Sequence, residues 1–253
     1  MNVPEKGGTP YGEQGCSFSF TDHPDFGVDT FFLERYLSGQ GFARVAGVDE
    51  AGRGPLAGPV VAGCVVLPGE GDHSCFKDSK KLTPRQREGL FSTLQESEAY
   101  VGVGIVSARE IEQVNILQAS LLAMRRAIED CLPEGLPDFL LVDGTFAVPM
   151  SLSQQTLIKG ESKSASVAAA SIIAKVTRDR IMARAHEEFP HYNFLKNQGY
   201  PTKEHRQSIA EHGPCILHRR TFKGVREFLC EQKEQPSAAC QQKLWSDKAV
   251  SNT

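Results

Sequence analysis

The sequence lacks the features that would place it in a membrane or in a disulfide-stabilised secreted class. No apolar run approaches the roughly 20 residues of a membrane span, and no basic-then-apolar stretch at the start indicates a signal peptide. The seven cysteines are scattered, odd in number and without a CxxC pair, which suits a reducing cytoplasm better than a disulfide framework. We therefore expect a cytoplasmic protein that does not enter a membrane.

Length and composition predict one globular domain with an extension at each end. The chain has 253 residues, 40% of them hydrophobic, which is enough for a sizeable core. We expect a mobile N-terminal arm over 1–40 with a short helix at 29–40, a main domain over 41–230, and a disordered tail over 231–253. The net charge is −3, but residues 196–226 carry seven basic side chains against two acidic ones. This stretch can neutralise phosphates, although an ordinary solvated face is the simpler alternative.

Strands come first along the main domain, and helices and strands then alternate. The apolar pattern predicts strands at the ranges 43–49, 56–67, 100–107, 139–142 and 156–159. Helices are predicted from the capping pattern that begins at Thr83, from an apolar face over 114–132, and over the alanine-rich run 164–189. This order favours an α/β fold with a mixed sheet flanked by helices, followed by a small helical subregion from about 190.

Two adjacent acids, Asp49 and Glu50, end the first predicted strand, and Gly52-Arg53-Gly54 follows them at once. Asp143 ends the fourth strand and Glu161 follows the fifth, and ligand sites in such sheets lie beyond strand ends, so we expect these acids to converge. Carboxylates can hold two divalent ions about 4 Å apart for phosphodiester hydrolysis. Taken singly, each acid is more often a solvated residue. Because neighbouring strand residues point to opposite faces, one of the adjacent pair requires a bend or a bulge.

The segment VAGVDEAGRGPLAGPVVAG (45–63) resembles the first signature of type 2 ribonucleases H, and in particular of bacterial ribonuclease HII. Further segments resemble later signatures of that family in the same order: DSKKLT (78–83), NILQAS (115–120), LLVDGT (140–145), IKGESKS (158–164), AAASIIAKVTRDR (168–180), GYPT (199–202) and HRRTF (218–222). The resemblance covers residues 43–228 and implies a ribonuclease H-like sheet flanked by helices.

The resemblance also implies an activity and a set of ligands. The enzyme would cleave the RNA strand of RNA–DNA hybrids and nick duplex DNA 5′ to a single ribonucleotide, leaving 3′-hydroxyl and 5′-phosphate ends, as in ribonucleotide excision repair. Asp49, Glu50, Asp143 and Glu161 would hold two Mg²⁺ or Mn²⁺ ions, although most relatives have aspartate at the last position. Gly52-Arg53-Gly54 and Tyr200 would recognise the 2′-hydroxyl at the junction of ribose and deoxyribose.

Basic and polar residues elsewhere are candidate phosphate contacts, although such residues on helices are more often simply exposed. The candidates are Lys80, Lys81, Asn115, Lys175, Arg178, Arg219 and Arg220. Asp179 competes with Glu161 for the fourth ligand position, but its arginine neighbours favour an ion-pairing role. His212, Cys215 and His218 have a metal-like spacing without a fourth ligand nearby, so we expect no metal site there. Gln241–Trp245 resembles a peptide that docks on the bacterial sliding clamp, a pattern that also recurs by chance.

Two other functional classes fit part of the pattern. Gly52, Gly54 and Gly58 after a strand suggest a dinucleotide-binding loop, but their spacing is GxGxxxG, Pro55 would interrupt the helix start, and two carboxylates precede the site. A non-catalytic module that binds RNA–DNA hybrids is the second alternative, and the retained acids argue against it. Within the resemblance, ribonuclease HIII usually carries a substantial N-terminal domain, for which forty residues are too few. We expect a monomer.

Overall fold

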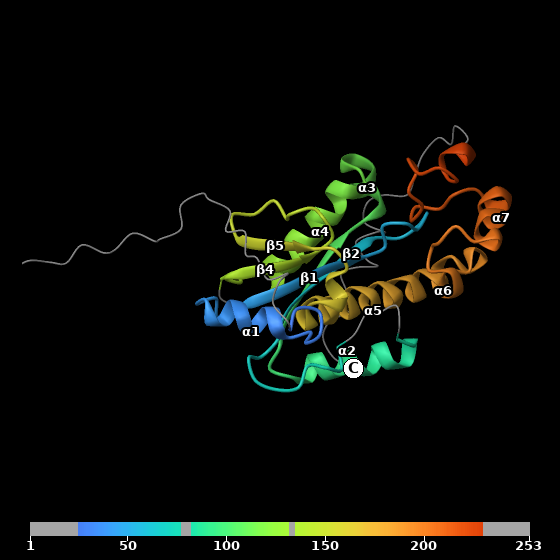
Figure 1. Cartoon of the computed structure of the whole chain (residues 1–253). Coiled ribbons are helices and arrows are strands. Elements are labelled where there is room, and N and C mark those ends of the chain that lie inside the picture. Colours follow the sequence, from blue (N-terminus) through green and yellow to red (C-terminus); the bar gives the residue numbers. More distant parts are fainter. Residues whose placement is uncertain (1–24, 77–81, 132–134, 230–253) are drawn as a thin grey trace, which may run out of the picture.

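One mixed sheet forms the centre of the molecule (Figure 1). The computed structural model describes residues 25–76, 82–131 and 135–229, and within these ranges the strand order is β3-β2-β1-β4-β5. The strands are β1 (Val45–Ala51), β2 (Val60–Val66), β3 (Tyr100–Val106), β4 (Phe139–Asp143) and β5 (Ser153–Leu157). Antiparallel pairing joins β1 to β2 and β2 to β3, whereas β1, β4 and β5 are parallel. The predicted mixed sheet is confirmed, but β2 starts later than expected and β5 starts earlier.

Helices cover both faces of this sheet. They are α1 (Phe32–Gly39), α2 (Pro84–Glu96), α3 (Ala108–Val114), α4 (Ile116–Cys131), α5 (Ala165–Glu188), α6 (Phe194–Asn197) and α7 (Lys203–His212). The predicted start of α2 is confirmed, because the side chains of Thr83 and Gln86 form a reciprocal capping box. The sequence interpretation missed α3, although Ser107 and Glu110 make the same box there.

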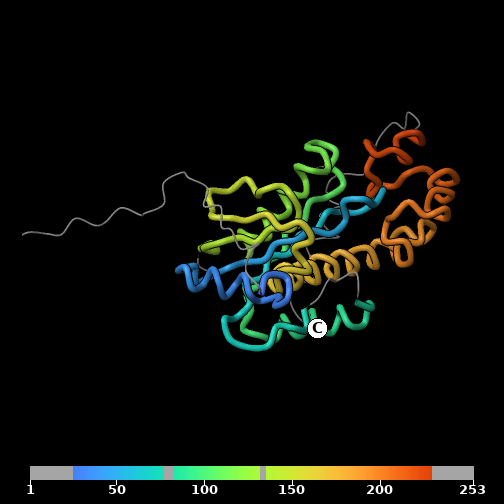
Figure 2. The backbone as a smooth tube through the Cα atoms, viewed as in Figure 1, coloured from blue at the N-terminus to red at the C-terminus, as the bar shows by residue number. Residues whose placement is uncertain are grey.

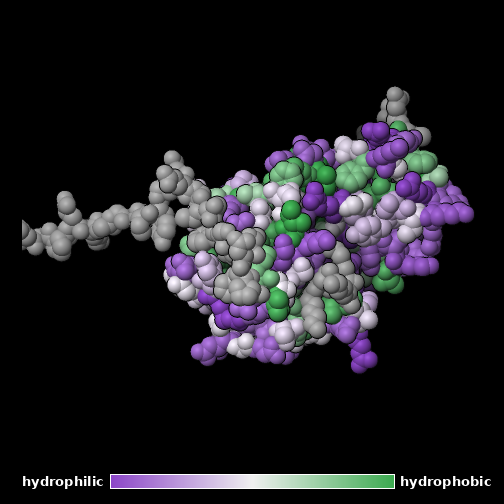
Figure 3. Space-filling view, viewed as in Figure 1, coloured by the Kyte–Doolittle hydropathy of each residue, from purple (hydrophilic) through white to green (hydrophobic). Residues whose placement is uncertain are grey.

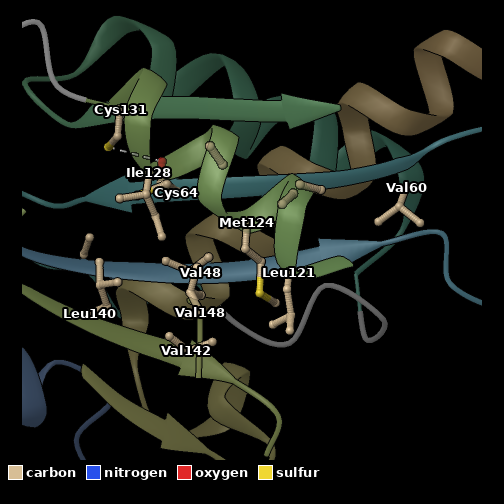
Figure 4. Packing of buried hydrophobic residues seen from close by; sticks show 14 of the residues in the cluster. Val48, Val60, Cys64, Leu121, Met124, Ile128, Cys131, Leu140, Val142 and Val148 are labelled. Carbon is tan, nitrogen blue, oxygen red and sulfur yellow. Dashed lines mark hydrogen bonds between the residues drawn. The ribbon is translucent and has the colours of Figure 1, made fainter. Parts of the chain in front are cut away.

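Glycines allow the two long helices to pack closely on the sheet. A Cβ at Gly104 on β3 would lie 1.9 Å from the carbonyl oxygen of Ala123 in α4, and a Cβ at Gly63 on β2 would lie 2.4 Å from that of Ala170 in α5. On the α4 face, apolar side chains including Val48, Met124 and Ile128 form one buried cluster (Figure 4). A second cluster lies between α5, α2 and the opposite face.

The last described part of the chain folds back onto the β1–β2 connection. Figure 2 shows the turn between these strands beside the red segment near the end of the described chain. Backbone hydrogen bonds join them, from Gly58 N–H to the Leu217 carbonyl and from Arg219 N–H to the Leu56 carbonyl. Together with α6 and α7, this segment has its own apolar cluster, so it forms the predicted helical subregion. No helix in the described ranges is both long enough and apolar enough to cross a membrane.

Candidate active site

The parallel strands β1 and β4 carry Asp49 and Asp143 toward the same edge of the sheet. Gly47 packs against the start of α5, so Asp49, two residues later, faces the α5 side of the sheet. Val48 belongs to the cluster on the α4 side, which places Glu50 on that face of the strand. Of the bend or bulge expected at the two acids, a bulge is excluded, because β1 pairs with β2 in continuous register through Ala51. Both acids are instead presented where the strand ends.

Mutual repulsion and burial mark these acids as one cluster. Asp49 is 5% exposed, and its pKa is raised well above the usual range by burial and then by the charges of Glu50, Asp143 and Glu161. Burial also raises the pKa of Glu50, and the nearby Arg53 guanidinium opposes that shift. The four predicted acids therefore lie within electrostatic reach of one another, although they come from separate segments of the chain.

Neighbouring groups hold three of these carboxylates in place. Asp143 Oδ1 accepts a 2.7 Å hydrogen bond from the backbone N–H of Gly160, the residue before Glu161. Glu161 Oε2 accepts one from the Ser171 hydroxyl at 3.1 Å, and Arg53 Nη1 lies 3.2 Å from Glu50 Oε1. Sequence reasoning missed Gly160 and Ser171. The only signal was a glycine beside an acid and a serine within an alanine-rich helix.

The donor set suits a hard divalent cation. Carboxylate oxygens are the ligands that Mg²⁺ and Mn²⁺ prefer, and a cation relieves the repulsion that raises the pKa of Asp49. Among the described residues, no three acidic, histidine or cysteine side chains already form a ligand group for an ion. One oxygen of each of three carboxylates, those of Glu50, Asp143 and Glu161, meets a donor of the protein.

The Gly52-Arg53-Gly54 turn lies beside Tyr200, the residue with which the family resemblance grouped it. A Cβ at Gly54 would lie 3.7 Å from Tyr200 Cε1, and the adjacent backbone is tied by a 2.8 Å hydrogen bond from Leu56 N–H to the Gly199 carbonyl. Gly52 has φ of +99°, a conformation that favours glycine. Tyr200 is 43% exposed, so its ring is accessible to a ligand next to the turn. Its role in recognition stays a prediction.

Two of the predicted phosphate contacts are wrong, because Arg178 and Arg219 are buried within the fold. The Arg219 guanidinium donates hydrogen bonds to the carbonyls of Gly52, Arg53, Gly58 and Pro59. Arg178 donates to the carbonyls of Ala57, Pro59 and Gln198. Burial lowers the pKa of Arg178 to about 10 and of Arg219 to about 9, so both stay charged near neutral pH. Both guanidinium groups are therefore used to hold the backbone of the β1–β2 connection.

The remaining basic and polar candidates have mixed settings. Lys175 pairs with Asp179 at 2.6 Å, so Asp179 is the ion-pairing residue expected rather than a fifth acid of the cluster. The Asn115 side chain accepts from the N–H groups of Leu117 and Gln118 and so caps α4. Arg220 is partly exposed beside the buried Arg219. Lys80 and Lys81 lie outside the described residues, as does Gln241–Trp245.

The metal-like spacing of His212, Cys215 and His218 does not bring the three together. His218 Nδ1 accepts from the backbone N–H of Cys215, whereas the His212 ring packs against His191. The Nε2 atom of His218 instead meets that of His205 at 3.0 Å. His205 lies three residues after the Gly-Tyr-Pro-Thr segment, and sequence reasoning did not select it.

Hydrophilic residues cover much of α6 and α7, the helices that flank Tyr200 in the chain (Figure 3). Lys196, Lys203 and Arg206 are exposed there, as expected for the basic stretch 196–226.

Known proteins of one family match this sequence and this geometry. A sequence profile described as Ribonuclease HII matches residues 46–225. The Ribonuclease HII of Desulfotalea psychrophila (strain LSv54 / DSM 12343) is 56% identical over 208 residues, which are 82% of this chain and 92% of that protein. The crystal structure of ribonuclease H2 from Pyrococcus horikoshii OT3 has a TM-score of 0.62 and 29% identity, covering 73% of this chain and 96% of its own. A chain of the PCNA:RNase HII complex from Archaeoglobus fulgidus has a TM-score of 0.60 and 26% identity, covering 78% and 99%.

Proposed function

Because this chain belongs to the ribonuclease HII family of metal-dependent endonucleases, which act on RNA–DNA hybrids, we propose that it cleaves the RNA strand with two divalent ions held by its acidic cluster. We further propose that it nicks duplex DNA on the 5′ side of a single embedded ribonucleotide. The products would be a 3′-hydroxyl and a 5′-phosphate, the ends that ribonucleotide excision repair requires. The observation that carries the proposal is the convergence of the four acids next to the glycine–arginine–glycine turn.

The acids have distinct places in this mechanism. Asp49 is buried at the centre of the cluster and would contact both ions, while Glu50, Asp143 and Glu161 would complete their ligand shells. Bound Mg²⁺ or Mn²⁺ supplies an activated water and offsets the extra negative charge that develops on phosphorus. Arg53, whose Nη1 lies 3.2 Å from Glu50 Oε1, would contact the substrate beside this ligand.

Selection of the ribonucleotide would take place at the recognition turn, which we define as residues 52–54 together with Tyr200. Backbone groups of a glycine-flanked turn approach a ribose 2′-hydroxyl closely, and this hydroxyl distinguishes RNA from DNA at one position. The half-exposed Tyr200 ring would stack on the deoxyribose that follows. Arg219 supports this step indirectly, since its hydrogen bonds fix the Gly52 and Arg53 carbonyls, and Arg178 holds the adjoining Ala57 carbonyl.

Further proposals concern a protein partner, the oligomeric state and the location of the protein. The Archaeoglobus fulgidus neighbour forms a complex with PCNA, and this supports a corresponding proposal that our chain docks on a sliding clamp through Gln241–Trp245. Deletion of residues 239–253 should then abolish clamp capture in a pull-down and leave nicking intact. We propose a monomer that acts in the cytoplasm.

Cleavage of a DNA duplex with one embedded ribonucleotide tests the central proposal. With Mg²⁺ or Mn²⁺ we expect a single nick 5′ to the ribonucleotide, and with EDTA no nick. If the protein cleaved only long RNA stretches, the proposed hydrolase activity would stand, but the proposed recognition of single ribonucleotides would be wrong. Intact binding without cleavage at any metal concentration would instead favour the non-catalytic module.

A further inference from the structure

Two buried histidines connect the C-terminal subregion to the backbone of Tyr200. His205 in α7 and His218, in the segment that pairs with the β1–β2 connection, are 0% and 1% exposed. Their Nε2 atoms lie 3.0 Å apart, and His205 Nδ1 lies 2.9 Å from the Tyr200 carbonyl oxygen. At the other end, the backbone N–H of Cys215 donates to His218 Nδ1 at 3.0 Å. The three contacts form one continuous path from Cys215 to Tyr200.

The chemistry of the two ends fixes the direction of every hydrogen bond on this path. A carbonyl oxygen only accepts, so His205 Nδ1 must carry a proton, and a neutral His205 then accepts at Nε2. A backbone N–H only donates, so His218 Nδ1 must be unprotonated and a neutral His218 then donates from Nε2. The two assignments, made from opposite ends, agree at the bond between the histidines. Both rings must therefore be neutral, with the proton on Nδ1 in His205 and on Nε2 in His218.

Apolar and aromatic packing keeps this path out of water. The Tyr192 ring meets His218 edge-on with centroids 4.7 Å apart, and the Phe194 ring meets His205 at 5.5 Å. Burial lowers the pKa of His218 to about 3 and also lowers that of His205, so both rings stay neutral near pH 7. Water therefore does not compete for the hydrogen bonds of either ring.

The path ends on the peptide that orients the recognition tyrosine. The Tyr200 carbonyl belongs to the bond to Pro201, and its orientation sets ψ of Tyr200. Thr202 N–H also donates to this oxygen at 2.8 Å, and on the other side of the tyrosine the Gly199 carbonyl accepts from Leu56 N–H. His205 thus adds a fixed, buried donor to a backbone whose side chain is half exposed.

We propose that His205 is a positioning residue for ribonucleotide recognition, because its hydrogen bond holds the Tyr200 backbone and so keeps the ring opposite Gly54, while His218 sets the tautomer in which His205 donates that bond. The inference rests on the proposed role of Tyr200 at the junction of ribose and deoxyribose. Neither histidine touches substrate. Their effect is on the choice between a single ribonucleotide and a continuous RNA strand, in which no adjacent deoxyribose is available to the ring.

A pair of His205 variants separates positioning from general stability. In His205→Gln the side-chain amide replaces the ring at Nε2, so it can accept from His218 but does not reach the Tyr200 carbonyl. In His205→Asn the amide replaces the ring at Nδ1, so it can donate to the Tyr200 carbonyl but does not reach His218. Each loses one buried hydrogen bond. The readout is the ratio of nicking rates on a duplex with one ribonucleotide and on a continuous hybrid. We expect this ratio to fall roughly fivefold in His205→Gln, the equivalent of one hydrogen bond, and to stay near wild type in His205→Asn.

Two further variants complete the design. Tyr192→Phe is the matched control, because it loses a hydrogen bond to the Gly213 carbonyl in the same subregion and leaves the path intact. Its ratio should not change. Tyr200→Ala should lower the ratio, and His205→Gln should lower it no further in that background, since His205 acts through Tyr200. An equal fall in His205→Gln, His205→Asn and Tyr192→Phe would overturn the inference in favour of general destabilisation.

The outcomes distinguish the two proposals. If Tyr200→Ala leaves the ratio unchanged, the recognition role of Tyr200 fails and the inference fails with it. If Tyr200→Ala lowers the ratio but His205→Gln does not, only the inference fails. ¹⁵N NMR of the histidine rings gives a test that does not use activity: we expect the Nδ1–H tautomer for His205 and the Nε2–H tautomer for His218. The reverse pair, or a charged ring at pH 7, would also overturn the inference.

Discussion

The backbone N–H of Gly160 donates a 2.7 Å hydrogen bond to Oδ1 of Asp143, which joins the end of β4 to the turn that carries Glu161. Asp143→Asn keeps an oxygen for this bond and removes only the charge. Cleavage should fall on the order of a thousandfold, because a ligand of the ions is weakened while the fold persists. Single-turnover cleavage measures the loss, and a gel shift with the same hybrid should show nearly wild-type binding. Loss of binding together with a lower melting temperature would make Asp143 structural instead.

Removal of the central acid should stabilise the protein when metal is absent. The fold raises the pKa of Asp49, so ionisation of this acid opposes folding in full above the folded pKa, and the penalty shrinks as the pH falls from there toward the ordinary pKa of the unfolded chain. Asp49→Asn should therefore melt about 2 °C or more above wild type at pH 8 in EDTA, and it should be inactive. Asp179→Asn is the control. It loses an ion pair with Lys175, so its melting temperature should not rise. A lower melting temperature for Asp49→Asn would contradict this account of the cluster.

The order of elements was predictable from the sequence because local patterns determine most of it. The capping residues at Thr83, the apolar face over 116–131 and the run of β-branched residues in β2 each agree with their structure. The missed helix α3 is short, and its capping box at Ser107 was its main signal. The start of β2 was placed too early, because residues 56–59 look strand-like but pair with the C-terminal segment, a contact that no local pattern encodes.

The sequence identified the acids and glycines of the site, but it did not reveal which of the basic side chains nearby are buried. The acids and the glycine turn follow strand ends, so their convergence follows from topology. Arg178 and Arg219 were predicted to contact phosphate because they are basic, with ordinary exposure as the alternative, and both are buried instead. Only the fold reveals that the carbonyls of the recognition turn face inward and need buried donors. His205 was overlooked for the same reason, since its partner His218 is thirteen residues away.

Arg219 should be irreplaceable even by another cation. Its planar guanidinium donates to four carbonyls at once, whereas lysine is a point charge that leaves several of them unpaired. Arg219→Lys should lower the free energy of unfolding by roughly 2–4 kcal/mol. Arg220→Lys, at the adjacent and partly exposed position, should change it by no more than roughly 0.5 kcal/mol. Urea unfolding of both variants tests this, and equal stabilities would show that the turn does not depend on the buried guanidinium.

Acid should weaken the fold through His218. Its folded pKa of about 3 lies below the usual value, so its stabilising contribution is complete above about pH 6.5 and is lost as the pH falls toward the folded pKa. Each such histidine adds a slope of about 1.4 kcal/mol per pH unit within that window. The groups that face this ring are His205, Cys215 and Tyr192, and none is a carboxylate. His218→Gln should therefore lose stability less steeply than wild type between pH 6 and pH 4 in urea titrations. Parallel slopes would mean that folding does not lower the pKa of His218.

The close approach of α4 to β3 should make Gly104 hard to replace. Its added Cβ would meet the Ala123 carbonyl oxygen at 1.9 Å and the Ala127 nitrogen at 2.6 Å, and neither backbone atom can move without displacing the helix. Gly104→Ala should lower the free energy of unfolding by roughly 3 kcal/mol or more. Gly89→Ala in α2 has open space around it and should raise stability by about 1 kcal/mol, since alanine favours helix. Denaturant midpoints of the two variants should thus shift in opposite directions. A tolerated Gly104→Ala would mean that α4 can move away from the sheet without losing the core that it shares with β1 and β2.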